Sequence, residues 1–406
     1  MTQSRTAIEA VFREEHGLVV AGLARYLGDL ELAEDALQDA CVAALGAWTE
    51  DIPRNPAAWL TTTARRKAVD RIRRTRNLQR KYEAIAQTLA NVSDETLDED
   101  IISDDRLRLI FTCCHPSLSI DARVALTLKT VGGLTTVEIA NAYLVPETTM
   151  AQRIVRAKRK IRDAGIPYRV PGDAELPDRV HGVLAVIYLI FNEGYASSSI
   201  DAVRRPELAA EAIRLATIID QLLPNEPEVL GLLALMHFHE ARGTARTDEE
   251  GNAVLLDDQD RTLWDQGHIT NATTYLDRAL ARETPGPYQI QAAISAVHIE
   301  AATPSDTDWD QIAALYCSLR RHINSPIVQL NHAVAVSKAT DASKGLVMVD
   351  AISGLDEYPY FHTARASLLK ELGRTSEAIR AYEQARDTST SDAQRRFFER
   401  RLDELR

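Results

Sequence analysis

Helix-forming residues at helical spacing run through almost the whole of this 406-residue chain, and they limit its fold more than any other feature. Ala, Leu, Glu and Arg dominate, and apolar residues recur at intervals of three and four. No stretch shows the sustained apolar–polar alternation that a half-buried strand requires. The sequence therefore predicts an all-α protein, and its length predicts two or three hydrophobic cores.

Two breaks divide the predicted helices into three parts. The segment 91–105 carries seven carboxylates and few large apolar residues, so it predicts an acidic linker. The segment 165–177, GIPYRVPGDAELP, is rich in Pro and Gly and predicts a domain boundary. We therefore expect helical domains at 1–90 and 106–170 and a long helical extension at 178–406.

The extension ends in a recognisable repeat. Ala364–Ala385 reads ARASLLKELGRTSEAIRAYEQA, with small residues on both sides of a Leu372–Gly373 turn. Small residues at such positions let paired helices approach closely, as in a tetratricopeptide repeat. Weaker echoes occur at Pro227–Arg242 and Tyr275–Ala281. The extension is therefore predicted to be a tetratricopeptide-like helical domain.

The formal net charge of −12 hides two strongly basic stretches. Nine cationic side chains between Arg65 and Lys81 accompany one acid, Asp70, and six lie between Arg153 and Arg162. Two basic faces on an acidic protein suit a two-point contact with a polyanion. For either stretch alone, a solvated helix face remains the alternative interpretation.

The second basic stretch belongs to a predicted helix-turn-helix, Leu134–Lys160, with the sequence LTTVEIANAYLVPETTMAQRIVRAKRK. A short amphipathic helix reaches a break at Leu144–Pro146, and a basic helix then starts near Glu147. This is the geometry with which many proteins place a recognition helix in the major groove of DNA. A plain helical hairpin with a charged outer face is the alternative.

The first basic stretch is an amphipathic helix, Ala57–Lys81, preceded by a break at Pro53 and Pro56 where Asn55 is a candidate cap. Its predicted core face consists of Trp59, Leu60, Ala64, Ala68, Val69 and Ile72. Arginines crowd the opposite face and would bind phosphates in a salt-dependent manner. Taken alone, the helix could equally well bind RNA or face the ribosome.

A third helix, Glu31–Trp48, is amphipathic and acidic. Its predicted polar side carries Glu31, Glu34, Asp35, Gln38 and Asp39. Its predicted apolar side carries Leu32, Leu37, Val42, Ala43 and Leu45. The acidic side suits a basic partner helix, and a solvated helix is the alternative.

These three stretches, in this order, resemble an extracytoplasmic-function sigma factor of bacterial RNA polymerase. The resemblance implies contacts with the clamp of the polymerase β′ subunit from Asp35, Gln38 and Asp39. It implies contacts with the −10 promoter element from Arg65, Arg66, Lys67, Arg71, Arg73 and Arg74. It implies contacts with the −35 element from Thr148, Thr149, Gln152, Arg153 and Arg156.

The resemblance extends to a subgroup with a tetratricopeptide-like extension, through FTCCHPSLS, GGLTT, IPYRVP, VIYLIFNEGY and GPYQIQAAI. It implies core RNA polymerase (β′ clamp and β flap) and promoter DNA as partners, with the linker in the active-site channel. We expect the extension to regulate the protein in cis and to bind a protein or peptide. Two departures are Arg66, where many members have Asn, and Ala151, where many have Lys.

Other features exclude alternative classes. The four cysteines form no disulfide framework, the amino terminus has no signal core, and no apolar run approaches the ~20 residues of a membrane span, which together predict a cytoplasmic protein. Cys113-Cys114-His115 is interpreted as buried structural thiols, and His237 and His239 should point to different faces. We expect no enzyme, metal or cofactor. The rival hypotheses are a helix-turn-helix regulator with a tetratricopeptide-like sensor that never joins polymerase, and a tetratricopeptide scaffold.

Overall fold

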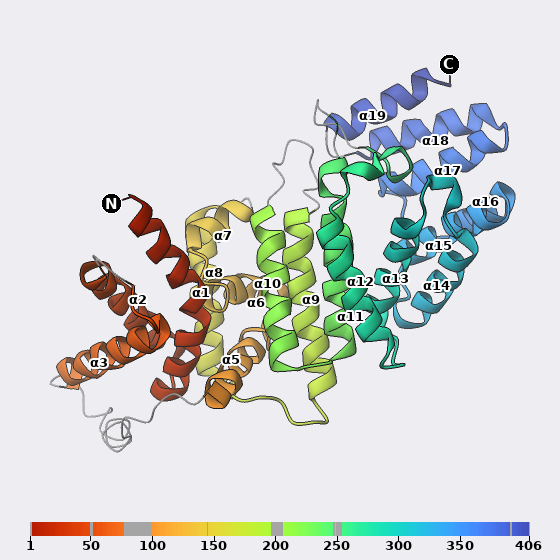
Figure 1. Cartoon of the computed structure of the whole chain (residues 1–406). Coiled ribbons are helices and arrows are strands. Elements are labelled where there is room, and N and C mark those ends of the chain that lie inside the picture. Colours follow the sequence, from red (N-terminus) through yellow and green to blue (C-terminus); the bar gives the residue numbers. More distant parts are fainter. Residues whose placement is uncertain are drawn as a thin grey trace. The chain divides into compact units, whose positions relative to one another are not determined.

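The computed structural model describes residues 2–48, 52–76, 99–143, 145–195, 206–246, 248, 254–389 and 392–405. Within these ranges every regular element is a helix, and no strand occurs. The chain divides into two compact units, Met1–Ile190 and Phe191–Arg406 (Figure 1). The prediction of an all-α fold is confirmed.

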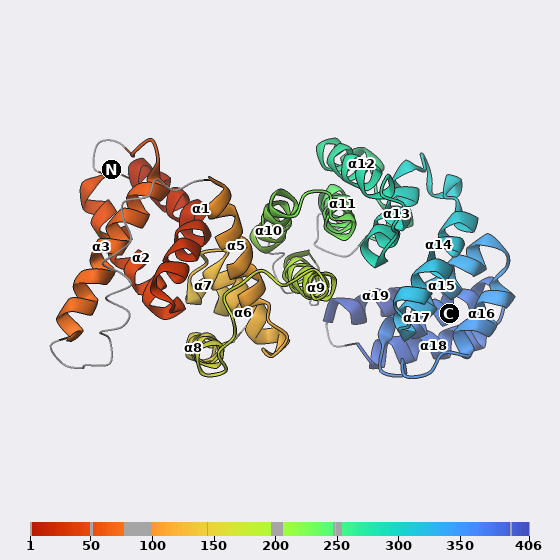
Figure 2. The same cartoon turned by 90° about the horizontal axis from the view of Figure 1, so that it is seen from below.

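The first unit contains two helical bundles (Figure 2). Its helices are α1 (Thr2–Leu27), α2 (Leu30–Ala47), α3 (Pro56–Arg76), α5 (Glu99–Cys113), α6 (Ile120–Thr130), α7 (Thr136–Ala142), α8 (Glu147–Asp163) and the greater part of α9 (Leu176–Tyr195). We call α1–α3 the amino-terminal bundle and α5–α8 the helix-turn-helix bundle. Helix α1 packs on α2 and α3 and also along α5, so it joins the two bundles.

Local sequence signals set the ends of the helices in the amino-terminal bundle. Gly28, with φ +68°, ends α1, and the Asp29 carboxylate accepts hydrogen bonds from the first backbone N–H groups of α2. Asn55 Oδ1 accepts a hydrogen bond of 2.9 Å from the Ala58 N–H, and Pro56 occupies the first position of α3. The predicted break and cap before the basic helix are confirmed.

The buried face of α2 differs from the predicted one. The buried residues are Ala33, Ala36, Leu37, Ala40 and Ala44, which form a stripe at helical spacing. Val42 and Leu45 were expected on the apolar side but are 69% and 44% exposed. The physical reason is close packing: α1 and α3 approach α2 along a row of alanines, which leaves the larger side chains outside.

The helix-turn-helix bundle begins earlier than expected. Helix α5 starts at Glu99, inside the predicted linker 91–105, and residues 91–98 lie outside the described ranges. Asp105 is buried, and its carboxylate lies 2.9 Å from Arg25 Nε of α1. Because α5 packs along α1, the carboxylates at the end of the predicted linker are part of a helix.

The helix-turn-helix itself follows the prediction. Helix α8 starts at Glu147, as expected, and buries Met150, Ile154, Ala157 and Ile161 on one stripe. Helix α7 starts with a capping box, in which Thr135 Oγ1 accepts from the Glu138 N–H and Glu138 Oε2 accepts from the Thr135 N–H.

The second unit consists of helices and short connections. Its α-helices are the end of α9, α10 (Pro206–Leu222), α11 (Pro227–Ala241), α12 (Gln266–Leu280), α13 (Pro287–Glu300), α14 (Trp309–His322), α15 (Pro326–Ala339), α16 (Ala342–Asp350), α17 (Pro359–Glu371), α18 (Thr375–Asp387) and α19 (Asp392–Asp403). Its short 3₁₀ turns are η2 (Gly243–Arg246), η3 (Leu256–Asp258), η4 (Arg261–Leu263) and η5 (Pro304–Asp306). The unit begins within α9, beyond the predicted boundary at 178, because α9 continues across the expected junction.

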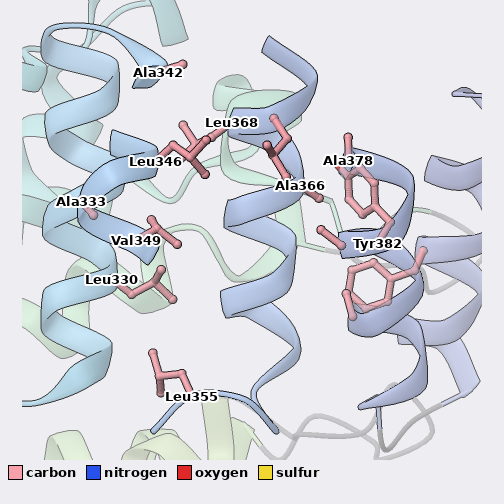
Figure 3. Close-up of a cluster of buried hydrophobic side chains, with 14 of the residues drawn as sticks. Leu330, Ala333, Ala342, Leu346, Val349, Leu355, Ala366, Leu368, Ala378 and Tyr382 are labelled. Atoms are coloured by element: carbon pink, nitrogen blue, oxygen red, sulfur yellow. The ribbon is translucent and has the colours of Figure 1, made fainter. Parts of the chain in front are cut away.

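The predicted carboxy-terminal repeat is present as α17 and α18. Gly373, with φ +71°, lies in the turn between them, where a left-handed conformation favours glycine. Ala366, Ala378 and Tyr382 are buried in a cluster that also receives side chains from α15 and α16 (Figure 3). The small residues Ala366 and Ala378 therefore let α17 and α18 pack closely, as the repeat pattern predicted.

None of the described helices combines the length and the apolar character that crossing a bilayer requires.

Candidate nucleic-acid interface

The amino-terminal half of α8 presents an open polar face. Thr148, Thr149, Gln152 and Arg156 are all exposed, on the side away from the buried stripe of α8. Hydroxyl, amide and guanidinium groups at the start of a recognition helix can reach base edges and phosphates in the major groove. Four of the five side chains predicted for this contact therefore share one accessible face.

The fifth side chain, Arg153, is differently placed. It is partly buried, and its Nη2 lies 3.8 Å from the Asp121 carboxylate of α6. A contact between Arg153 and a phosphate would have to compete with this carboxylate. Sequence inspection could not find the competitor, because Asp121 lies on another helix of the bundle.

Helix α3 supplies the other basic face. Its buried stripe is Leu60, Thr61, Ala64 and Ala68. Arg66 and Lys67 are exposed, whereas Arg65 lies over the Tyr26 ring of α1, 4.9 Å from the ring centroid. The side chains of Arg71, Arg73 and Arg74 lie outside the part of the chain that the structure describes.

Trp59 packs in the amino-terminal bundle, as expected for a core residue. Its ring meets Trp48 edge-on with the centroids 5.2 Å apart, and Trp48 in turn contacts Phe12 at 5.6 Å. These three rings connect α3, α2 and α1. The aromatic cluster holds α3 in place while its basic side faces outward.

Helix α2 presents a mixed acidic and apolar face. Gln38 and Asp39 are exposed, and the exposed Val42 and Leu45 follow them at intervals that place all four on one side of the helix. Asp35, one turn earlier, is partly buried. Exposed apolar side chains beside polar groups are typical of protein interfaces. The exposure of Val42 and Leu45 was not expected, because the sequence predicts them on the apolar side of the helix.

A set of contacts between α1–α2 and the helix-turn-helix bundle, which we call the interbundle contact, centres on Glu34. Glu34 Oε2 lies 2.5 Å from Lys158 Nζ of α8, and Glu34 Oε1 accepts a hydrogen bond of 2.8 Å from Thr130 Oγ1. The side chains of Glu34 and Lys158 are only 12% and 14% exposed. At the rim, the exposed Arg162 Nη1 lies 3.3 Å from Glu31 Oε2.

The backbones also come close at the interbundle contact. A Cβ atom on Gly17 would lie 2.6 Å from the Val131 carbonyl oxygen, so only glycine allows this approach of α1. His16 Nδ1 lies 3.2 Å from the Thr130 carbonyl oxygen and therefore carries the proton that it donates. Burial lowers the pKa of His16, which keeps its imidazole neutral in this contact.

Cysteines and histidines singled out in the sequence have structural surroundings. Cys113 and Cys114 are buried, and burial raises the pKa of the Cys114 thiol to about 11 and that of Cys113 well above its usual value. His237 Nδ1 lies 2.8 Å from His268 Nδ1, whereas His239 Nδ1 lies 3.2 Å from the Tyr195 hydroxyl. Within the described ranges no three His, Cys, Asp or Glu side chains gather where a metal ion could bind.

Comparison with family models matches both bundles. Residues 11–78 match the Sigma-70 region 2 family, and residues 108–161 match the Sigma-70 region 4 family. Residues 179–280 match a family of unknown function. The region 2 match includes α2 and α3, and the region 4 match includes α7 and α8.

Similar proteins support these matches. An uncharacterized protein of Rhizobium meliloti is 42% identical over 392 residues, which are 95% of this chain and 93% of the relative. The ECF RNA polymerase sigma factor SigK of Mycobacterium ulcerans is 30% identical over 161 residues, 38% of this chain and 83% of the relative. SigK of Mycobacterium tuberculosis strain H37Rv is 35% identical over 107 residues, 26% of this chain and 56% of the relative. No solved structure matches the chain.

Proposed function

Because this chain belongs to the extracytoplasmic-function sigma factors of RNA polymerase, we propose that its two bundles divide promoter recognition between them. As a sigma factor it binds core polymerase and promoter DNA and directs the initiation of transcription. A regulator that never joins polymerase would leave the region 2 match without a role, so that rival is not favoured. The observation that supports the division of labour best is the open polar face of α8 within the region 4 match.

The proposed −35 contacts come from this face of α8. Thr148, Thr149 and Gln152 would read base edges, and Arg156 would neutralise a phosphate. Arg153 would join them after it leaves Asp121. The same bundle is our candidate for the contact with the polymerase β flap.

The proposed −10 contacts come from α3. Arg66 and Lys67 face outward and would bind the DNA directly, whereas Arg65, held over Tyr26, would help to orient the helix. Arg71, Arg73 and Arg74 remain proposed contacts on the same helix.

The proposed polymerase-binding face is on α2. Gln38 and Asp39, with Asp35 beside them, would meet basic groups of the β′ clamp. Val42 and Leu45 would supply the apolar part of the same contact, and their exposure supports this proposal. Because this partner acts in the cytoplasm, a cytoplasmic location is part of the proposal.

The interbundle contact would have to open on a promoter. Elements at −10 and −35 are about 25 base pairs apart, or roughly 85 Å at 3.4 Å per base pair. Helix α8, with 17 residues, is only about 25 Å long. Its Lys158 lies 2.5 Å from Glu34 of the amino-terminal bundle, so the two bundles are in direct contact. The described arrangement is therefore our candidate for the resting state of the free protein.

The extension is our candidate for a regulator in cis. Helices α17 and α18 form a tetratricopeptide-like pair, and such repeats bind peptides or partner helices. We propose that a protein or peptide partner of the second unit adjusts the activity of the two bundles.

Run-off transcription with core polymerase tests the division of labour. The template is DNA upstream of the gene or a promoter selected from a random library, and the sigma preparation is the full chain. We expect initiation with the wild type, its loss with Gln152→Ala plus Arg156→Ala on templates that need the −35 element, and unchanged initiation with Arg282→Ala, an exposed residue of the second unit. Full initiation by the double variant on those templates would refute the assignment of α8.

A further inference from the structure

A cavity of about 740 Å³ lies in the first unit, and none of the residues proposed above to contact DNA or the β′ clamp lines it. Its walls come from the turn after α5, from Arg123 of α6, from the segment between α8 and α9, and from the first turns of α9. This volume lies within the roughly 300–1,000 Å³ of ordinary small-molecule pockets. The FTCCHP and IPYRVP motifs, which the promoter assignments leave without a role, both contribute to the lining.

Two arginines of the lining are fixed by hydrogen bonds to backbone carbonyl groups. Arg123 donates to the carbonyl oxygens of Leu118 and Pro116, each at 2.9 Å, and Arg179 Nη2 donates to the Phe111 carbonyl oxygen at 2.6 Å. In the described part of the chain, neither guanidinium forms an ion pair with a carboxylate. Both positive charges are thus held in place at the wall of the cavity.

The remaining charges leave a cationic excess. Arg169 pairs with Glu175 at 3.1 Å, and the other carboxylate of the lining is the exposed Asp178. Burial is the main cause that lowers the pKa of Arg179; Cys114 and Glu175 oppose this change, and the positive charges of Arg169 and Arg123 reinforce it. An anion in the cavity would relieve this repulsion.

The lining also offers hydrogen-bond donors. A guanidinium carries five N–H groups, and the contacts above use two of those on Arg123 and one of those on Arg179. His115 Nδ1 accepts from the Ser117 N–H at 3.2 Å, so its neutral ring keeps a donor at Nε2. Burial and the two nearby arginines lower the pKa of His115, which favours this neutral form.

We propose that this cavity binds a small organic anion, whose carboxylate or phosphate is held by Arg123 and Arg179. The apolar part of the ligand lies against Pro116, Pro167 and Pro171, which also line the cavity. Paired guanidiniums are the protein groups best suited to hold carboxylate and phosphate oxygens.

The position of the cavity gives such a ligand access to the interbundle contact. Tyr168 lies between the lining residues Pro167 and Arg169, and its hydroxyl lies 2.9 Å from the Ala21 carbonyl oxygen of α1 and 3.0 Å from that of Asp105. A ligand that holds this segment therefore acts beside the junction of the two bundles. The proposal concerns binding alone, and its failure would leave the promoter assignments standing.

Titration calorimetry of the full chain with phenyl phosphate tests the proposal, with phenol as the uncharged counterpart and benzoate as the carboxylate counterpart. We expect phenyl phosphate or benzoate to bind at millimolar concentrations, and phenol to bind at least about tenfold more weakly. Arg123→Gln and Arg179→Gln should each weaken anion binding about tenfold. Arg282→Gln, which removes one exposed positive charge in the second unit, should leave it unchanged.

A second variant keeps the test decisive if Arg179→Gln disturbs folding. Asp178→Asn removes an exposed carboxylate from the lining, so it should tighten anion binding several-fold without loss of structure. The proposal is overturned if neither anion binds at millimolar concentrations, if phenol binds as well as phenyl phosphate, or if Arg123→Gln and Asp178→Asn leave the affinities unchanged.

Discussion

The two basic helices of the first unit, α3 and α8, have similar composition but different surroundings. On α3, Arg66 and Lys67 are exposed. On α8, Lys158 and Arg162 pair with Glu34 and Glu31 of α2, and Lys160 donates to the Ser117 carbonyl oxygen. Charge counted along a helix therefore overstates what α8 can offer to DNA, because a neighbouring bundle already neutralises part of it.

The two ends of α8 also differ in their contacts with α2. Lys158 and Arg162, near its carboxy-terminal end, take part in the interbundle contact, whereas Thr148, Thr149, Gln152 and Arg156 remain exposed. We therefore propose that recognition by α8 depends on its first turns, whereas Lys158 and Arg162 of its last turns pair with α2. Four experiments test this difference between α3 and α8.

The largest effect should come from Glu34→Gln. Lys158 would then stay largely buried without its counter-charge, and removing one partner of a buried pair costs about 3 kcal/mol. Urea unfolding of the full chain measures the loss. The control is Glu31→Gln, whose pair with Arg162 is exposed and contributes less than about 1 kcal/mol. Equal losses from the two variants would contradict a central role for Glu34.

Arg156→Ala should weaken promoter binding by the polymerase complex by about 1–2 kcal/mol and reduce the slope of log affinity against log salt by about 0.9. Arg156 is exposed on the proposed −35 face, so it would release one phosphate counterion. Fluorescence anisotropy with labelled promoter DNA over a salt series gives both quantities. Arg162→Ala is the matched control, and a slope change as large as that of Arg156→Ala would remove the distinction between the two ends of α8.

Asn55→Ala should destabilise the full chain by about 1 kcal/mol, because Asn55 Oδ1 caps the first turn of α3. Helix α8 has no side-chain hydrogen bond at its N-cap residue, Pro146, so the two basic helices begin differently. Thermal unfolding measures the loss. Asn55→Asp keeps an acceptor at the same position and should change stability by only a few tenths of a kcal/mol; a loss as large as that of Asn55→Ala would show that the cap is not responsible.

Stability should fall as pH decreases below the ordinary His pKa of 6.5. Burial lowers the pKa of His16, while Glu34 opposes this change and Lys129 and Lys158 reinforce it. The unfolded chain then binds a proton that the folded chain rejects, so the contribution of the neutral ring is complete above pH 6.5 and is lost progressively below it. Urea unfolding on both sides of pH 6.5 detects the change. His16→Asn should reduce the dependence on pH, and an unchanged dependence would exclude His16 as its source.

Most of the helices could be predicted from local patterns. The apolar stripe of α8, the turn before it and the Asn55 cap of α3 all depend on residues within a few positions of one another. The repeat at α17 and α18 was visible for the same reason, since small residues and Gly373 mark its crossing and its turn. Local periodicity is sufficient where a helix buries one regular face.

The candidate sites could be predicted only in part. The polar face of α8 agrees with the prediction, but Val42 and Leu45, which the sequence predicts on the apolar side of α2, are exposed although large apolar side chains are usually buried. In α2 the alanine stripe takes that place, and only the packing of α1 and α3 reveals it. The predicted linker 91–105 also extends too far, because α5 already begins at Glu99. Its last residue, Asp105, is buried and paired with Arg25 of α1, a contact that local sequence does not reveal.

The helical class, the order of the two basic helices and the repeat of the extension were all predictable from spacing along single segments. Which charged side chains remain free to bind a partner depends instead on how the helices pack. Glu34 and Lys158 are separated by 124 positions, and Arg123 and Arg179 meet at one cavity from different helices. Such pairs depend on how helices pack, and electrostatic interactions depend on distance and burial in space, which composition and periodicity do not contain.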